Sequence, residues 1–248
     1  MLNKYRPYLI STAMLYLSEA VPALYPLKAL AFVPFLIRIR QDQPIVESVL
    51  ATLVLMGSWT LAIFLSDDSG IHFPVLNTIA LLLYVISRKS LGPQRSYIAL
   101  TFFWLSAEAL PHTFPALSAW AYPLSKVLFE LHFLKDWLSM TGFLGASFWI
   151  ISLNIIALAL TVKYFNAQLW RPLSVSFALF ILIGILFPIE FSPISPVESL
   201  SDYPKISKPL MAADLFLMRM SYFLAFFLLL FLGVKHILRN SKRDDRFT

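Results

Sequence analysis

Long apolar runs, broken by short polar or basic stretches, make up most of this sequence. The runs do not alternate apolar and polar residues over about ten positions, as the strands of a membrane barrel would. Lipid satisfies no backbone hydrogen bonds, so an apolar run that crosses a bilayer must be helical unless it belongs to a closed barrel. The pattern predicts an all-α, polytopic transmembrane bundle. About eight spans are expected, near residues 8–24, 27–37, 45–65, 73–86, 96–110, 137–162, 172–189 and 212–234.

Proline sets the expected breaks near the start of the chain. Several spans are shorter than the roughly 20 residues that cross about 30 Å of hydrocarbon. Pro26 separates the first two, and Pro22 and Pro34 flank that point. Because proline removes a backbone donor and clashes with the preceding turn, these two spans are expected to form a bent pair of short helices.

Two segments lie between the expected spans on the outer side. Residues 111–136 hold Trp120, Tyr122 and other apolar groups, which makes them too apolar for a solvated loop. They are expected to be interfacial or re-entrant, either as an aromatic belt or as a lid over a lipid site. Residues 190–211 contain four prolines and several serines, which predicts a short linker without a fold of its own.

Composition narrows the class of protein. The chain of 248 residues is 58% hydrophobic and 14% charged, with a mean hydropathy of +0.73, whereas an ordinary soluble domain carries about 25% charged residues. A soluble enzyme, a disordered protein and a coiled coil are excluded. The chain has no cysteine, so a disulfide framework, a Cys-ligated metal and a thiol nucleophile are excluded as well.

The charge pattern predicts sidedness. With the N-terminus inside, the inner segments hold 14 Lys and Arg and the outer ones hold 5. Basic residues collect in the cytoplasmic loops of membrane proteins, so both termini are expected in the cytoplasm. The net charge of +6 is therefore explained by membrane topology, and no nucleic-acid partner is expected.

Ionisable residues at membrane depth are costly and are functional candidates by default. Glu19, Glu108, Asp214 and Arg219 fall within or at the ends of expected spans. One interpretation is snorkelling or a structural ion pair between helices. In the other, Arg219 holds a lipid phosphate, which a planar guanidinium suits well.

Histidines on the outer side raise the question of catalysis. Glu108 and His112 are four residues apart, as are His132 and Asp136, and a histidine oriented by a carboxylate can act as a general base. Pro111 weakens the first pair, and histidines at membrane interfaces also serve as polar anchors. Metal-binding and phosphate-loop motifs are absent from the sequence, so neither a metal nor a cofactor is expected.

Four stretches together carry a family resemblance. In the first, Trp137 leads to Thr141-Gly142, a glycine-rich helix start through Gly145, and Asn154. The others are residues 103–108, from Phe103 through Trp104 to Glu108, residues 121–124 with Tyr122-Pro123, and the apolar run 26–36. Their order resembles the membrane domain of the apolipoprotein N-acyltransferase family over roughly residues 20–190.

The resemblance stops at the catalytic part. That family carries a nitrilase-like domain with a Glu-Lys-Cys triad between its last two spans, where this chain has only residues 190–211 and no cysteine. The resemblance therefore implies a scaffold of a bacterial inner membrane to which the family's reaction does not carry over. Phospholipid is the expected partner, with lipoproteins or a separate catalytic subunit as further candidates. The expected lipid-binding residues are Trp104, Glu108, Trp120, Tyr122, Trp137, Trp149 and Arg219.

Two other functions stay open from the sequence. A self-sufficient membrane acyltransferase would use Glu108, His112 and His132 in place of the missing thiol. A small-solute transporter would need a polar path through the bundle, and the spans hold few polar residues.

Overall fold

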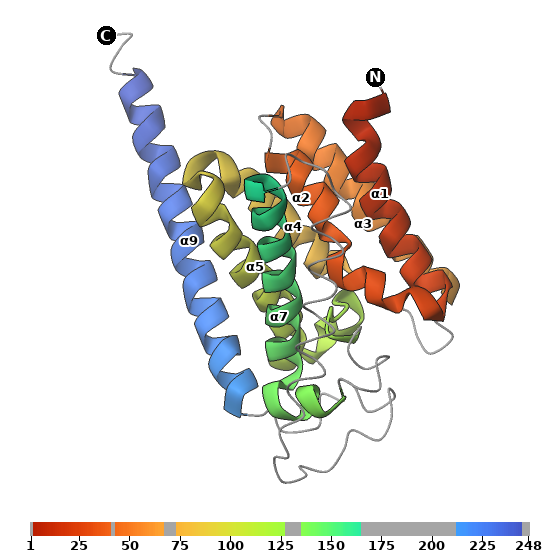
Figure 1. The fold of residues 1–248 in the computed structure, drawn as a ribbon. Coiled ribbons are helices and arrows are strands. Elements are labelled where there is room, and N and C mark those ends of the chain that lie inside the picture. The colour runs from red at the N-terminus through yellow and green to blue at the C-terminus, as the bar shows by residue number, and fades with distance from the viewer. Residues whose placement is uncertain (1, 41–42, 67–72, 127–134, 165–211, 245–248) are drawn as a thin grey trace.

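The computed structural model describes residues 2–40, 43–66, 73–126, 135–164 and 212–244, and these residues form an all-helical bundle (Figure 1). The all-α prediction is confirmed for them. α1 begins and α9 ends at the same end of the bundle. Arg40, Arg88, Arg95 and Lys235 belong to helix ends there, and we call it the basic end.

Most of the described helices overlap the expected spans, with shifted ends, but the expected span 27–37 is divided between η1 and α2. The elements are α1 (Leu2–Ala20), η1 (Pro22–Leu30), α2 (Phe32–Arg40), α3 (Ile45–Ser66), α4 (Val75–Leu91), α5 (Pro93–Thr113), η2 (Pro115–Trp120), α7 (Lys135–Tyr164) and α9 (Ala212–Asp244). Val21 is extended and Pro22 begins the 3-10 helix η1, so the chain breaks at Pro22, one of the three prolines named above. Pro26, which was expected to separate the first two spans, lies within η1, and Pro34 lies within α2. The expected span 172–189 and linker 190–211 lie outside the described residues.

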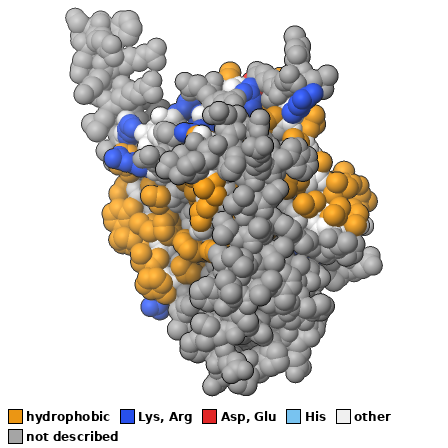
Figure 2. Space-filling model, viewed as in Figure 1, with side chains coloured by type: hydrophobic (Ala, Val, Ile, Leu, Met, Phe, Trp, Pro, Cys, Tyr) orange, Lys and Arg blue, Asp and Glu red, His pale blue; other side chains and the backbone are white. Residues whose placement is uncertain are grey.

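Three described helices are long and apolar enough to cross a membrane, over Ile45–Leu65, Gly142–Val162 and Asp214–Gly233. They indicate a membrane protein. Large apolar side chains such as Val54, Phe64 and Phe226 are more than 60% exposed, whereas monomeric soluble proteins rarely expose wide apolar patches. Figure 2 shows apolar side chains over the flank of the bundle and Lys and Arg gathered at the basic end. The total of about eight spans and their sidedness stay predictions.

A glycine makes the sharp turn between α4 and α5. Gly92 has φ +78°, a conformation that side chains rarely adopt, and its N–H donates to the Arg88 carbonyl at 3.0 Å. Pro93 then begins α5, where a missing N–H costs nothing. At its other end α5 continues through Pro111 to Thr113, beyond the expected end at Leu110.

α7 is broken near its start, at Gly142, which has φ 70° and ψ 178°. α9 packs along α5 and α7. Polar contacts hold it at both ends of the bundle: Asp214 accepts from Leu144 N at 3.0 Å, and the Tyr222 and Thr113 hydroxyls lie 3.0 Å apart. At the basic end, Lys235 Nζ donates to the Ser90 carbonyl.

Candidate functional site

Two glutamates lie buried among aromatic rings at the end of the bundle opposite the basic end. The carboxylate cluster comprises Glu19, Lys28, Trp59, Trp104, Glu108 and Tyr122. Each of these residues is less than 5% exposed. They come from α1, η1, α3, α5 and the extended segment after η2, so the site forms only when these elements pack together.

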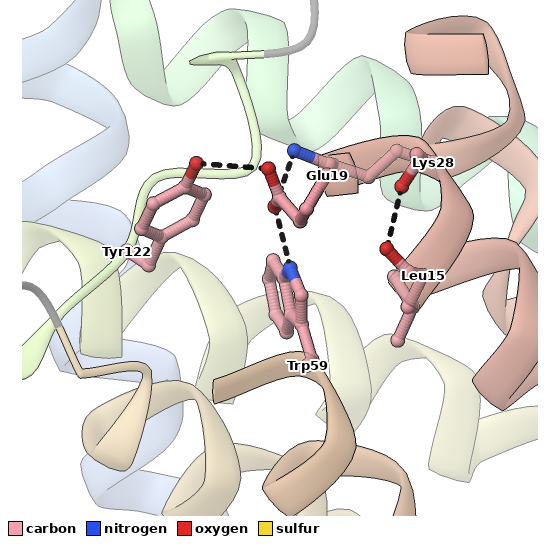
Figure 3. Close-up of polar contacts among 6 residues, drawn as sticks. Leu15, Glu19, Lys28, Trp59 and Tyr122 are labelled. Atoms are coloured by element: carbon pink, nitrogen blue, oxygen red, sulfur yellow. Dashed lines mark hydrogen bonds and ion pairs between the residues drawn. The ribbon is translucent and has the colours of Figure 1, made fainter. Parts of the chain in front are cut away.

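Glu19 is the centre of the first half of the cluster (Figure 3). Lys28 Nζ lies 2.5 Å from its Oε1, and Trp59 Nε1 donates to the same oxygen at 2.8 Å. The Tyr122 hydroxyl donates to Oε2 at 3.5 Å, a long hydrogen bond. The break at Pro22 turns η1 back across the end of α1, which brings Lys28 to Glu19 although nine residues separate them.

The ion pair needs these extra partners. Removing two charges from water costs several kcal/mol per ion, and their attraction offsets that cost only when further hydrogen bonds satisfy both groups. Trp59 and Tyr122 provide donors for the carboxylate. The Tyr122 ring also lies under Lys28 Nζ, 5.4 Å from ring centroid to nitrogen, where its π face attracts the ammonium.

Glu108 forms the second half of the cluster. Trp104, one helical turn earlier on the same face of α5, donates its Nε1 to Glu108 Oε1 at 2.7 Å. The backbone N–H of Leu124 donates to the same oxygen at 2.7 Å. Within the described residues no Lys or Arg pairs with Glu108, and its Oε2 is buried there without a hydrogen-bond partner.

Aromatic packing joins the two halves. The Trp59 and Trp104 rings are stacked, with centroids 6.4 Å apart and planes 18° apart. Phe32 from the start of α2 and Tyr122 meet these rings edge-on, Phe32 at 5.1 Å from Trp104 and Tyr122 at 5.5 Å from Trp59. Both are favoured geometries for aromatic pairs. The cluster is thus one rigid unit, not two separate sites.

Residues 121–125, which we call the strap, cross the end of the bundle and are held by three helices. Asn77 Oδ1 of α4 accepts from Tyr122 N at 3.0 Å, Glu108 of α5 accepts from Leu124 N, and Ser147 Oγ of α7 accepts from Ser125 N at 3.1 Å. A buried backbone without secondary structure needs such partners for its N–H groups. Three side chains therefore fix an irregular segment inside an apolar bundle.

An exposed aromatic ledge lies beside the strap. Phe114 and Trp120, at the two ends of η2, are 55% and 47% exposed, and the Phe73 ring lies 6.5 Å from that of Trp120. Phe73 N also donates to the Ala119 carbonyl at 2.7 Å, which ties η2 to the start of α4. The ledge is apolar and its backbone is anchored on both sides.

The structure separates the residues expected to bind lipid. Trp104, Glu108 and Tyr122 are buried among protein atoms and take part in the packing of the cluster. Trp120 and Arg219 are exposed, and Trp149 is half-buried. The side chain of Trp137 lies outside the described part. Asp214 bonds to Leu144 N and not to Arg219. Whether any of these residues binds lipid stays a prediction.

The outer histidines do not form the expected dyad where the structure describes them. Glu108 accepts from Trp104 and Leu124, while the His112 ring stacks on Phe143 at 4.5 Å. Burial lowers the pKa of His112. His72 and His132 lie outside the described residues, as does the side chain of Asp136. No group of three metal-ligating side chains occurs in the described residues.

Sequence reasoning missed Lys28, Trp59, Asn77 and Ser147 as members of this site. Lys28 is one of the five outer Lys and Arg in the predicted topology, yet it is fully buried. A lone lysine within the apolar run 27–37 was a usable signal, because a charge in such surroundings requires a partner.

Comparison with family models, curated proteins and solved structures finds no match to the chain.

Proposed function

We propose that this chain is a multi-span membrane scaffold that binds the acyl chains of a phospholipid or lipoprotein at the aromatic ledge, without catalysing a reaction. The proposed role is the one implied by the resemblance of the sequence to the membrane domain of the apolipoprotein N-acyltransferase family. A separate catalytic subunit would act on the bound lipid, in a bacterial inner membrane.

The observation that supports the proposal is the fixed strap beside an exposed ledge. Tyr122, Leu124 and Ser125 each have their N–H bonded to a side chain of a different helix. Phe114 and Trp120 remain exposed next to them. Tryptophan favours the boundary between lipid and water, and a preorganised apolar surface binds a chain without first having to order itself.

The chemistry of the described residues favours a non-catalytic role. Both carboxylate oxygens of Glu19 and one of Glu108 accept hydrogen bonds from protein groups. His112 lies against Phe143 and has no carboxylate partner among the described residues. Without cysteine the chain also lacks the thiol on which the resembling family forms its acyl intermediate.

Photo-crosslinking tests the proposal. The full chain is placed in lipid nanodiscs with a diacylated lipopeptide whose acyl chain carries a diazirine, and labelled sites are mapped by mass spectrometry. Labelling is expected to concentrate on residues 114–120, and Trp120→Ser is expected to reduce it several-fold. Phe227→Ser is the matched control, because Phe227 is an aromatic residue of α9 with nearly the same exposure, 48% against 47% for Trp120.

Two results would overturn the proposal. Labelling spread evenly over α3 and α9 would mean that the lipopeptide behaves as ordinary bulk lipid. A mass gain of one acyl chain on the lipopeptide, lost in His112→Ala or His132→Ala, would establish the acyltransferase alternative.

A further inference from the structure

A groove lies on the opposite half of the molecule, near the basic end. It runs between α5 and α7 and has a volume of about 810 Å³. Arg40 at the end of α2 and Arg95 in the first turn of α5 lie on its wall. Cavities that bind small ligands typically measure about 300–1,000 Å³, so this groove has the size of a ligand site.

The wall of the groove suits a hydrocarbon chain. Ile98, Phe148 and Val162 are 58%, 41% and 38% exposed along it, and Ile155 and Leu158 continue the apolar surface. The hydroxyl of Thr101 already donates to the Tyr97 carbonyl at 3.1 Å. Besides the arginines, Tyr97, Thr101 and Ser152 are the residues with polar side chains among the described lining.

The charge on the wall has one sign. Among the described residues that line the groove, Arg40 and Arg95 are the charged ones, and the ion pairs between described residues join other groups, Lys28 to Glu19 and Arg38 to Glu47. Arg88 Nη2 donates to the Arg40 carbonyl at 3.2 Å, which fixes the end of α2 beside α4. Two guanidinium groups next to an apolar channel complement a phosphate joined to an acyl chain.

We infer that this groove binds one anionic membrane phospholipid. Arg40 and Arg95 hold the headgroup phosphate, and one acyl chain lies against Ile98, Phe148 and Ile155. The site is at the level where Lys and Arg gather, which is the depth of a lipid headgroup (Figure 2). It lies far along the bundle from the ledge and does not depend on the function proposed there.

Native mass spectrometry of the full chain in detergent micelles tests the site by titration with phosphatidylglycerol, phosphatidylcholine or glycerol phosphate. One phosphatidylglycerol is expected to stay bound, several-fold more tightly than phosphatidylcholine, and glycerol phosphate is expected not to bind. The double variant Arg40→Gln/Arg95→Gln is expected to weaken phosphatidylglycerol binding by about 30-fold, from the usual contribution of a basic residue near an anionic lipid.

Lys89→Gln is the matched control, because Lys89 is an exposed basic residue at the same end that does not line the groove. Ala159→Phe fills the groove without changing the charge, and it is expected to abolish the retained lipid. An equal loss in Lys89→Gln would reduce the effect to general surface charge and overturn the site. Unchanged binding in Ala159→Phe would also overturn the site. So would a disulfide cross-link between a cysteine placed at Phe148 and one placed within residues 172–189, because it would show that protein occupies the groove.

Discussion

The carboxylate of Asp214 fills the space that a side chain at Gly142 would occupy. Its Oδ1 accepts from Leu144 N at 3.0 Å, just after the break in α7. An acidic group at this position satisfies N–H groups that the helix leaves unpaired and complements the positive end of the helix dipole. The contact between Asp214 and α7 therefore lies at the break in α7, caps the longer half of that helix and anchors the start of α9.

Gly142→Ala is expected to destabilise the protein by about 3 kcal/mol or more, because a φ of +70° with ψ near 180° is almost restricted to glycine and the new Cβ would collide with Asp214. Thermal unfolding in detergent micelles measures the loss. Gly57→Ala is the control: Gly57 lies in α3 with open space around it, so that variant should be neutral or slightly more stable. Equal losses in both variants would contradict the argument.

Asp214→Ala is expected to cost about 1 kcal/mol or more, the usual loss when a helix cap is removed. Asp214→Asn keeps an acceptor for Leu144 N and should recover much of the loss. In the Asp214→Ala background, Gly142→Ala should cost less than in the wild type, because the collision is gone while the backbone strain remains. Additive losses in this double-mutant cycle would show that the two residues do not interact.

Lys28→Met is expected to destabilise the protein by about 3–5 kcal/mol, because it leaves the Glu19 carboxylate buried without its cation. Adding Glu19→Gln removes the charge and should restore a large part of the loss. The control is Arg38→Met, which breaks a longer and more exposed contact of 3.9 Å to Glu47 and should cost about 1 kcal/mol or less. The idea fails if the double variant is as unstable as Lys28→Met alone.

His112 is expected to make the folded state less stable in acid. Burial lowers the pKa of His112 in the folded state, so the unfolded chain binds the proton more readily. Its neutral form thus adds stability above the unfolded pKa of about 6.5, and this contribution is lost as the pH falls below that value. Melting temperatures between pH 8 and pH 5 should fall less for His112→Gln than for the wild type; parallel curves would exclude this role.

Hydropathy was enough to predict where the helices lie. α3 covers Ile45–Ser66 against an expected span of 45–65, and α9 begins at Ala212 as expected. The proline breaks were also predictable, because Pro22 acts on its own backbone. These features depend only on residues that are close together in the sequence, so they can be predicted from it.

The cluster was not predictable in the same way. Glu19 bonds to Trp59 and Tyr122, which are 40 and 103 residues away. Nothing local to Trp59 distinguishes it from a tryptophan that faces lipid, and Asn77 shows no sign that it will hold the strap. Gly142 was noticed as part of a motif, whereas its role depends on Asp214, which lies 72 positions later in the chain, in another helix. Such partners appear only after the helices have packed.

The polar contacts at both ends of α9 also limit how the protein meets its membrane. Asp214 and Tyr222 hold one end of the helix and Lys235 holds the other, while apolar side chains such as Phe223 and Phe227 face outward between them. A helix fastened twice cannot tilt or slide on its own, relative to the rest of the bundle, to match a thinner or thicker bilayer. The bundle must tilt as a whole, or the surrounding lipid must compress or stretch to fit it.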